Sequence, residues 1–364
     1  MPSEYAHRVH FPHRRANSRK ERDDAHALKR AQDEHQHRLR RALIDLGIVA
    51  LLIIGAIQLE SQFSGVGAAL EKTRPEPLIL AVGFEILSEL GFVLAFLLVM
   101  DPDDRLFSKR MLGRQIAWTE LGGGMLLPAG AVGGPGIAAW ALNKVGMEGE
   151  LIAQRSFVLV FLNSAVDFAA VMFFGVTMYF GVLSGSTDPL LTILPAGIAF
   201  VVVVGVLLVP RVFLPLARRS SAHHPKAAIV LETLGRGVTG TVGEFRKHDW
   251  RLIGPVAYWA FDNAVLYAVF VALGHPPPVG VVVMSYLVGA LGGSIPIPAG
   301  LGSIAGMAGI LVAFGVSVGH ATAAVLVYQA ISIGVAIVGG AIAYFFLRRN
   351  LNHPELRAAL GEAP

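Results

Sequence analysis

The sequence contains no cysteine and has little charge: 15% of its 364 residues are Asp, Glu, Lys or Arg, against about 25% in soluble domains. Without cysteine the chain cannot form disulfides, use a catalytic thiolate or bind zinc through sulfur. Residues 1–41 carry 17 of the 56 charged side chains, whereas residues 263–347 carry none. A soluble surface cannot be built from such a stretch. The pattern excludes a soluble enzyme, a disordered protein and a nucleic-acid binder, and indicates one polytopic membrane domain with a tail.

Apolar segments that could span a membrane, which takes roughly 20 residues each, occur six times. They are 42–58, 78–100, 156–182, 190–210, 252–273 and 321–347. Two further apolar regions, 115–145 and 279–319, are interrupted by Gly and Pro near their centres, so each arm is too short for a ~30 Å hydrocarbon core. The predicted fold is an all-α polytopic membrane protein with about eight spanning helices plus two re-entrant, Gly/Pro-broken hairpins.

The distribution of basic residues predicts the orientation in the membrane. Of the 30 Lys and Arg, 28 lie in segments 1–41, 101–114, 144–155, 211–251 and 348–364. By the positive-inside rule these segments are cytoplasmic. We therefore predict a multi-pass protein of the cell (plasma or inner) membrane with both termini in the cytoplasm.

Three parts of the chain follow from these boundaries: a basic, His-rich cytoplasmic tail (1–41), a transmembrane domain (42–349) and a short C-terminal tail (350–364). No signal peptide is expected, because apolar sequence begins only at Ala42. The spacing of His7, His10 and His13 would allow metal binding, but a solvated tail explains it more simply. We assign no metal site and no cofactor.

The two broken regions resemble each other. Pro128-Ala-Gly-x-x-Gly aligns with Pro298-Ala-Gly-x-Gly at an offset of 170 residues, and this offset also superposes segments 78–100 and 248–270. We predict inverted-topology repeat halves, about 42–183 and 190–349, whose hairpins meet near mid-membrane. The residues assigned to the hairpin turns are Pro128, Gly130, Gly133, Pro135, Pro296, Pro298, Gly300, Gly302 and Ser303. Alternatively, Gly and Pro are simply frequent in ordinary membrane helices.

The helices that follow the two turns would direct their positive ends at the midplane. Pro135 suits a first helical position and Ser303 an N-cap. An anion such as a lipid phosphate could bind there.

Polar side chains inside the spans are the candidate substrate path, because ionisable residues in a membrane are costly and usually functional. No span contains Lys or Arg to neutralise them. Helix–helix hydrogen bonding is the alternative explanation for each one. The predicted path residues are Glu85, Glu89, Glu120, Asn163, Asp167, Asp262 and Asn263.

Basic residues at the cytoplasmic ends of the spans are predicted to contact anionic lipid. Segment 211–251 is expected as a basic cytoplasmic loop that lies on the leaflet. The predicted contact residues are Lys144, Arg155, Arg246, Lys247 and Arg251.

The second broken region carries a family resemblance. Pro296-Ile-Pro298-Ala-Gly300-Leu-Gly302, followed by an apolar helix, Gly315-Val-Ser and a final span that ends at Arg348-Arg349, resembles the membrane region of lysylphosphatidylglycerol synthases and its stand-alone flippase-like relatives. The resemblance covers roughly residues 42–349. It implies a helical membrane domain with re-entrant segments that moves a lipid between leaflets.

The sequence departs from the pattern of this family at three places. Ser303, Ala305 and Gly306 stand where the family usually has an acidic residue. Gly134 to Ile137 replace a Glu and an Arg, and Asn163 and Ser164 stand where an Arg is common. The synthases also carry a soluble aminoacyl-transfer domain, which is not expected here. The headgroup of the synthase substrate is therefore not carried over.

Three functions stay open from the sequence. The first is a translocase for an amphipathic, phosphate-bearing lipid or polyprenyl lipid, with no catalytic residues. The second is a non-transporting partner subunit in a cell-envelope lipid pathway. The third is an integral-membrane enzyme acting on a lipid headgroup, for which Glu120 with Lys144 and Arg155 is the available residue set. The expected partners are membrane lipids and envelope-biosynthesis membrane proteins.

Overall fold

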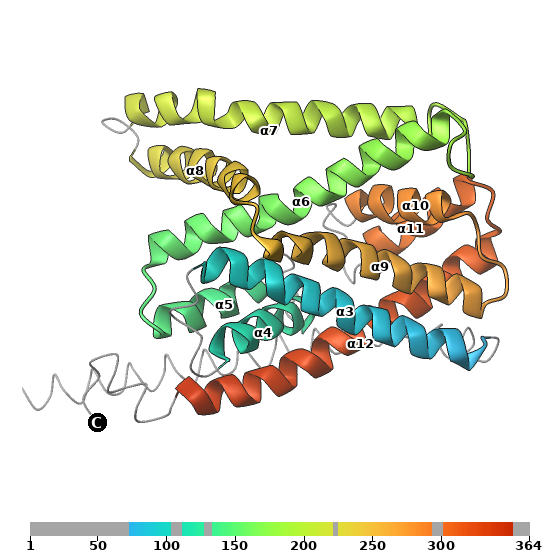
Figure 1. Ribbon diagram of the computed structural model, residues 1–364, viewed down its shortest axis with the longest axis horizontal. Coiled ribbons are helices and arrows are strands. Elements are labelled where there is room, and N and C mark those ends of the chain that lie inside the picture. Colours follow the sequence, from blue (N-terminus) through green and yellow to red (C-terminus); the bar gives the residue numbers. More distant parts are fainter. Residues whose placement is uncertain (1–72, 103–110, 127–132, 221–224, 293–300, 352–364) are drawn as a thin grey trace, which may run out of the picture. The chain divides into compact units, whose positions relative to one another are not determined.

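Every regular element that the structure describes is a helix (Figure 1). In this computed structural model the described residues are 73–102, 111–126, 133–220, 225–292 and 301–351. They all belong to the compact unit that begins at Gly55. The predicted span 42–58 lies outside the described residues.

In the described part of the chain, five helices are long and apolar enough to cross a membrane. Each overlaps a span predicted from the sequence, which confirms an all-helical, membrane-spanning class. Helix α6 has 31 residues, about 46 Å at 1.5 Å per residue, so it exceeds the hydrocarbon core and must tilt or extend beyond it. The five long helices are α3 (Pro75–Met100), α6 (Gly149–Tyr179), α7 (Ile193–Ser220), α9 (Ile253–Ala272) and α12 (Val318–Leu351).

Two pairs of short helices occupy the interrupted regions: α4 (Leu112–Leu126) with α5 (Gly133–Lys144), and α10 (Val279–Gly292) with α11 (Leu301–Ala313). Each helix has 12 to 15 residues, or about 18–23 Å. This is shorter than a ~30 Å core. The helices of each pair pack against each other.

Four of the predicted turn residues lie where the second helix of each pair begins. Gly133 and Pro135 lie in the first turn of α5, and Gly302 and Ser303 lie in the first turn of α11. Proline is tolerated there because the first turn of a helix leaves its N–H groups without intrahelical partners. Pro128, Gly130, Pro296, Pro298 and Gly300 lie outside the described residues.

Segment 211–251, expected as a loop, is mostly helical. It contains the end of α7, the helix α8 (Pro225–Lys247) and the 3₁₀ turn η2 (Trp250–Leu252). Helix α8 packs on α6 and α7. Thr241 Oγ1 lies 3.4 Å from the Val158 carbonyl oxygen, to which it donates, and a Cβ at Gly240 would meet the Val158 side chain. Small residues on α8 thus permit its close approach to α6.

Helices α3 and α9 form an antiparallel pair. Near one end the Arg74 N–H donates to the Ala272 carbonyl, and near the middle Ser88 Oγ donates to the Tyr258 carbonyl. Further along, Gly91 meets Gly254: a Cβ on either would lie 2.8 Å from the carbonyl oxygen of the other. Low residue numbers in α3 therefore face high numbers in α9, and the glycines allow the backbones to touch.

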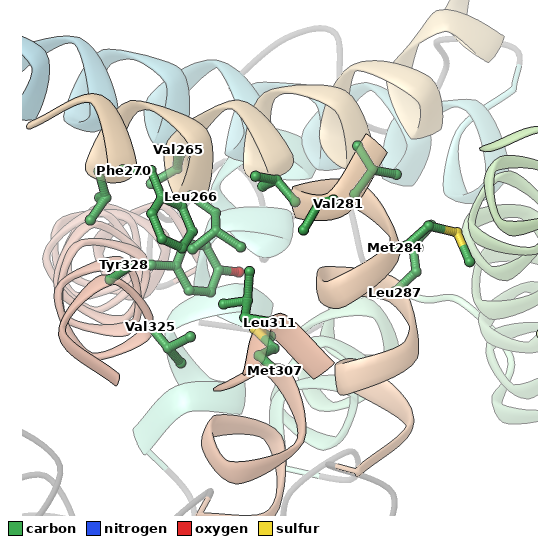
Figure 2. Packing of buried hydrophobic residues seen from close by; sticks show 14 of the residues in the cluster. Val265, Leu266, Phe270, Val281, Met284, Leu287, Met307, Leu311, Val325 and Tyr328 are labelled. Carbon is green, nitrogen blue, oxygen red and sulfur yellow. The ribbon is translucent and has the colours of Figure 1, made fainter. Parts of the chain in front are cut away.

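The apolar core consists of two clusters. One joins α3, α4, α5 and the first half of α6 around Phe96, Ile116, Leu142 and Leu162. The other joins the second half of α6 with α9 to α12, and Figure 2 shows its centre. There Tyr328 lies among apolar side chains and is only 5% exposed. A tyrosine so deeply buried requires a partner for its hydroxyl group.

Candidate functional site

Asp262 on α9 is the partner of two tyrosines, of which Tyr328 is buried and Tyr286 is half-buried. Tyr328 on α12 donates to its carboxyl oxygens at 2.9 and 3.1 Å. Tyr286 on α10 donates to Oδ2 of the same carboxylate. Asp262 thus fastens three helices that are distant in sequence, and it is 7% exposed.

Glu85 and Glu89 on α3 complete this acidic cluster. Ser332 on α12 donates to Glu85 Oε1 at 2.9 Å. Both glutamates are 2% exposed, and both are close enough to Asp262 for their charges to interact. Four helices therefore meet around three predicted path residues.

Several buried polar atoms on α3, α6 and α9 have no hydrogen-bond partner within the described residues. They include Oε2 of both glutamates and Oδ1 of Asn163 and Asn263. A buried polar atom without a partner costs about 1–3 kcal/mol. Such atoms persist where function requires them, and in a membrane they mark places where a polar ligand or water is accommodated.

A cavity of about 530 Å³ lies beside the first half of α6. Its lining includes Glu120 from α4, Asn143 from α5, and Ser156 and Asn163 from α6. Glu120 and Asn163, two predicted path residues, therefore share this cavity rather than joining Glu85 and Asp262. We refer to it as the first cavity.

A second cavity, of about 430 Å³, lies between α6, α7 and α10. Its polar lining consists of Ser164 and Asp167 on α6 and Tyr286 on α10. Tyr286 also donates to Asp262, and Asp167 is close enough to Asp262 for their charges to interact. The second cavity is thus next to the acidic cluster.

Helix α6 contributes to the lining of both cavities. The first is lined by α6 residues from Gly149 to Asn163, and the second by α6 residues from Ser164 to Val171. The change occurs at the middle of the 31-residue helix. Asn163 and Asp167 are four residues apart and so lie on one face of α6. Polar side chains therefore continue from the part of α6 that lines the first cavity to the part that lines the second.

Two of the predicted lipid-contacting cations also donate hydrogen bonds within the protein. Arg155 donates to the Met100 carbonyl at 2.6 Å. Arg251 donates to the Pro102 carbonyl at 2.8 Å and pairs with Asp249. Both stabilise the C-terminal end of α3, where free carbonyls favour cations.

The residues considered for an enzyme are Glu120, Lys144 and Arg155. Glu120 lines the first cavity, whereas Arg155 is engaged with Met100. In the described part of the chain Glu120 makes no hydrogen bond or ion pair to Lys144 or Arg155. Nor do those residues contain a group of three His, Asp or Glu that could hold a metal ion.

Sequence reasoning missed the tyrosines and Ser332. Tyr286 and Tyr328 both lie in the 85-residue stretch without charge. Their position in this stretch could have indicated them as site residues, because a tyrosine hydroxyl in an apolar segment needs a hydrogen-bond acceptor.

Long apolar helices, helices too short to span, and a buried polar site define a polytopic helical membrane protein. Residues 43–340 match the family described as the lysylphosphatidylglycerol synthase TM region, and the chain belongs to that family. No curated protein and no solved structure was found to match the chain.

Proposed function

We propose that this protein moves an amphipathic lipid between the two leaflets of the membrane. The observation that carries the proposal is that two cavities are lined by successive stretches of α6, the first up to Asn163 and the second from Ser164. A polar headgroup could pass from one cavity to the other along Asn163, Ser164 and Asp167 while its chains remain in lipid. Headgroup transfer would then avoid the cost of placing an unpartnered polar group in hydrocarbon. Family membership agrees with a lipid-related role.

An inverted repeat would relate the two halves of the chain, α3 to α6 and α9 to α12, by symmetry. The helix order long, short, short, long occurs twice, as α3 to α6 and as α9 to α12. The packing corresponds as well: α4 packs on α5 and α12, and α10 packs on α11 and α6.

The α3–α9 crossing supports the same symmetry. The 170-residue offset relates Ser88 to Tyr258, and these two residues touch at the crossing. The same offset relates Gly91 to Phe261 and Phe84 to Gly254. The two glycines are in contact with each other, and the two phenylalanine rings stack with their centroids 6.0 Å apart. Antiparallel helices that meet at equivalent residues are related by a two-fold axis perpendicular to them. In a membrane this axis lies in the bilayer plane, as in many transporters.

The short helix pairs would be the re-entrant hairpins of this arrangement, and both termini would lie in the cytoplasm. We propose that the protein carries out no covalent step. Its partners would be membrane lipids, with envelope-biosynthesis proteins as further candidates.

Lipid movement in proteoliposomes tests the proposal. Head-labelled lipids and native lipid extract would be assayed with wild-type protein and the Asp167→Asn variant. We expect protein-dependent movement that falls about tenfold or more in the variant, the effect of losing a charged hydrogen-bond acceptor. The matched control is Glu76→Gln, an exposed carboxylate in the first turn of α3, which should leave the rate unchanged. No movement across a broad headgroup panel, with or without a proton gradient, would refute the translocase and favour the partner-subunit alternative.

A further inference from the structure

The second cavity is polar at one end and apolar at the other. Ser164, Asp167 and Tyr286 form the polar end, and α7 contributes Leu194, Ile198 and Ala199 to the apolar wall. A mixed lining with few polar groups is typical of small-ligand sites, and about 430 Å³ lies within their usual range of roughly 300–1,000 Å³.

The apolar wall continues onto a surface that faces lipid. Leu194 and Ile198 line the cavity, yet their exposed fractions are 51% and 54%. Their helix is the least buried of the five candidate spans. A hydrocarbon chain lying along α7 could therefore reach the cavity without crossing a polar surface.

The polar end is built to accept hydrogen bonds. Asp167 makes no hydrogen bond or ion pair within the described part of the chain, whereas the Tyr286 hydroxyl already donates to Asp262. Among the described residues that line this cavity, none is Lys or Arg. An anionic group would therefore find no cationic side chain in this lining to pair with. A group that carries N–H or O–H donors would satisfy the Asp167 carboxylate.

We infer that the second cavity binds one membrane lipid, with an acyl chain along α7 and a donor-bearing headgroup at Asp167. The required chemistry is an ammonium or hydroxyl group at the end of the headgroup. A lipid phosphate would remain outside the acidic end. Its use as one terminus of the transport path rests on the proposed function, but binding in the cavity is measurable without transport.

Lipids with different headgroups show whether the cavity requires a hydrogen-bond donor or a positive charge in its ligand. The full-length protein in nanodiscs would be incubated with lipids of identical chains and ethanolamine, glycerol or choline headgroups. Choline keeps the positive charge of its nitrogen but has no N–H donor. We expect bound ethanolamine or glycerol lipid, counted by native mass spectrometry, to exceed choline lipid about tenfold, the value of a charge-assisted hydrogen bond. Ethanolamine above glycerol would identify an ammonium ligand, and the reverse a hydroxyl ligand. Equal retention of all three lipids would overturn the inference.

The location is tested by photocrosslinking. A lipid with a diazirine in its headgroup should label Ser164, Asp167 or Tyr286, and one with a diazirine in its acyl chain should label residues 190–199. Adducts confined to the outer surface of α7, such as Phe200 and Val201, would overturn the assignment. Both residues are more than half exposed and do not line the cavity.

Two variants link location and chemistry. Asp167→Asn should reduce the preference for donor-bearing lipid about tenfold, and Val201→Trp, on the lipid-facing side of α7, should not. The wild-type measurements decide the question even if Asp167→Asn does not fold. Binding without lipid movement would refute the proposed function and leave this site standing. Movement without binding here would refute the site alone.

Discussion

At the residue scale, the central feature is one carboxylate shared by two tyrosines. Asp262 is separated from Tyr286 by 24 residues and from Tyr328 by 66. A buried acceptor that retains its donors contributes to stability, and one that loses them leaves a desolvated charge or lone pair. The same contacts also hold the carboxylate beside the second cavity. Stability and the candidate path therefore depend on one set of hydrogen bonds.

Removing a tyrosine hydroxyl should weaken the fold. We expect Tyr328→Phe to lower the free energy of unfolding by about 1–2 kcal/mol, since interhelical hydrogen bonds in membranes are of this size. Chemical unfolding in detergent micelles measures the change. Tyr179→Phe removes a hydroxyl from the partly exposed end of α6 and should have no measurable effect. Equal stability of the Tyr328→Phe variant and the wild type would show that this hydroxyl does not hold α12 to α9.

At the element scale, α3 and α9 make a close backbone contact. Gly91 and Gly254 let the two backbones touch, and Ser88 adds a hydrogen bond at the crossing. In membranes, helices associate through such close packing, because apolar side chains gain little by leaving lipid. The rotation of α3 against α9 places Glu85 and Asp262 in one cluster.

Gly91→Ala tests this contact. The added Cβ would lie 2.5 Å from the Tyr258 backbone nitrogen, so the helices must separate, at a cost of about 1–3 kcal/mol. The control, Gly83→Ala in the same helix, places a Cβ where nothing lies within 4 Å. Thermal unfolding in micelles should show a lower midpoint for Gly91→Ala only. If both variants unfold alike, the close approach does not limit stability.

At the scale of the whole molecule, the arrangement of spans determines which cavity faces which leaflet. Lys144 precedes the N-terminal end of α6, and Thr187 follows its C-terminal end. His275 follows α9, which runs antiparallel to α3. The positive-inside count assigns Lys144 to the cytoplasm and the other two positions to the outside.

Single-cysteine labelling tests this orientation, because the chain has no cysteine of its own. In intact cells an impermeant maleimide should label Thr187→Cys and His275→Cys, and label Lys144→Cys only after permeabilisation. All three positions are exposed, so accessibility to the reagent is matched. Labelling of Lys144→Cys together with Thr187→Cys in intact cells would contradict the assignment of α6 as a span.

The sequence by itself determined the class of protein and the positions of five spans. Those properties depend only on neighbouring residues. About twenty consecutive apolar residues form a helix that satisfies its own backbone hydrogen bonds, and their side chains favour the hydrocarbon core over water. It also indicated Glu85, Glu89 and Asp262 as unusual, because each is costly in hydrocarbon. The helix of α8 was missed, since its polar composition resembles that of a loop.

Only the tertiary structure decided which polar groups meet. Asp262 could have faced lipid, Glu120 or Asp167 with the same sequence pattern, since hydropathy does not specify the rotation of a helix about its axis. That rotation follows from shape: glycines on α3 and α9 fit against each other, and the packing brings Tyr286 and Tyr328 to Asp262. For the same reason Glu120 lines the first cavity, and Arg155 and Arg251 donate to carbonyls at the end of α3.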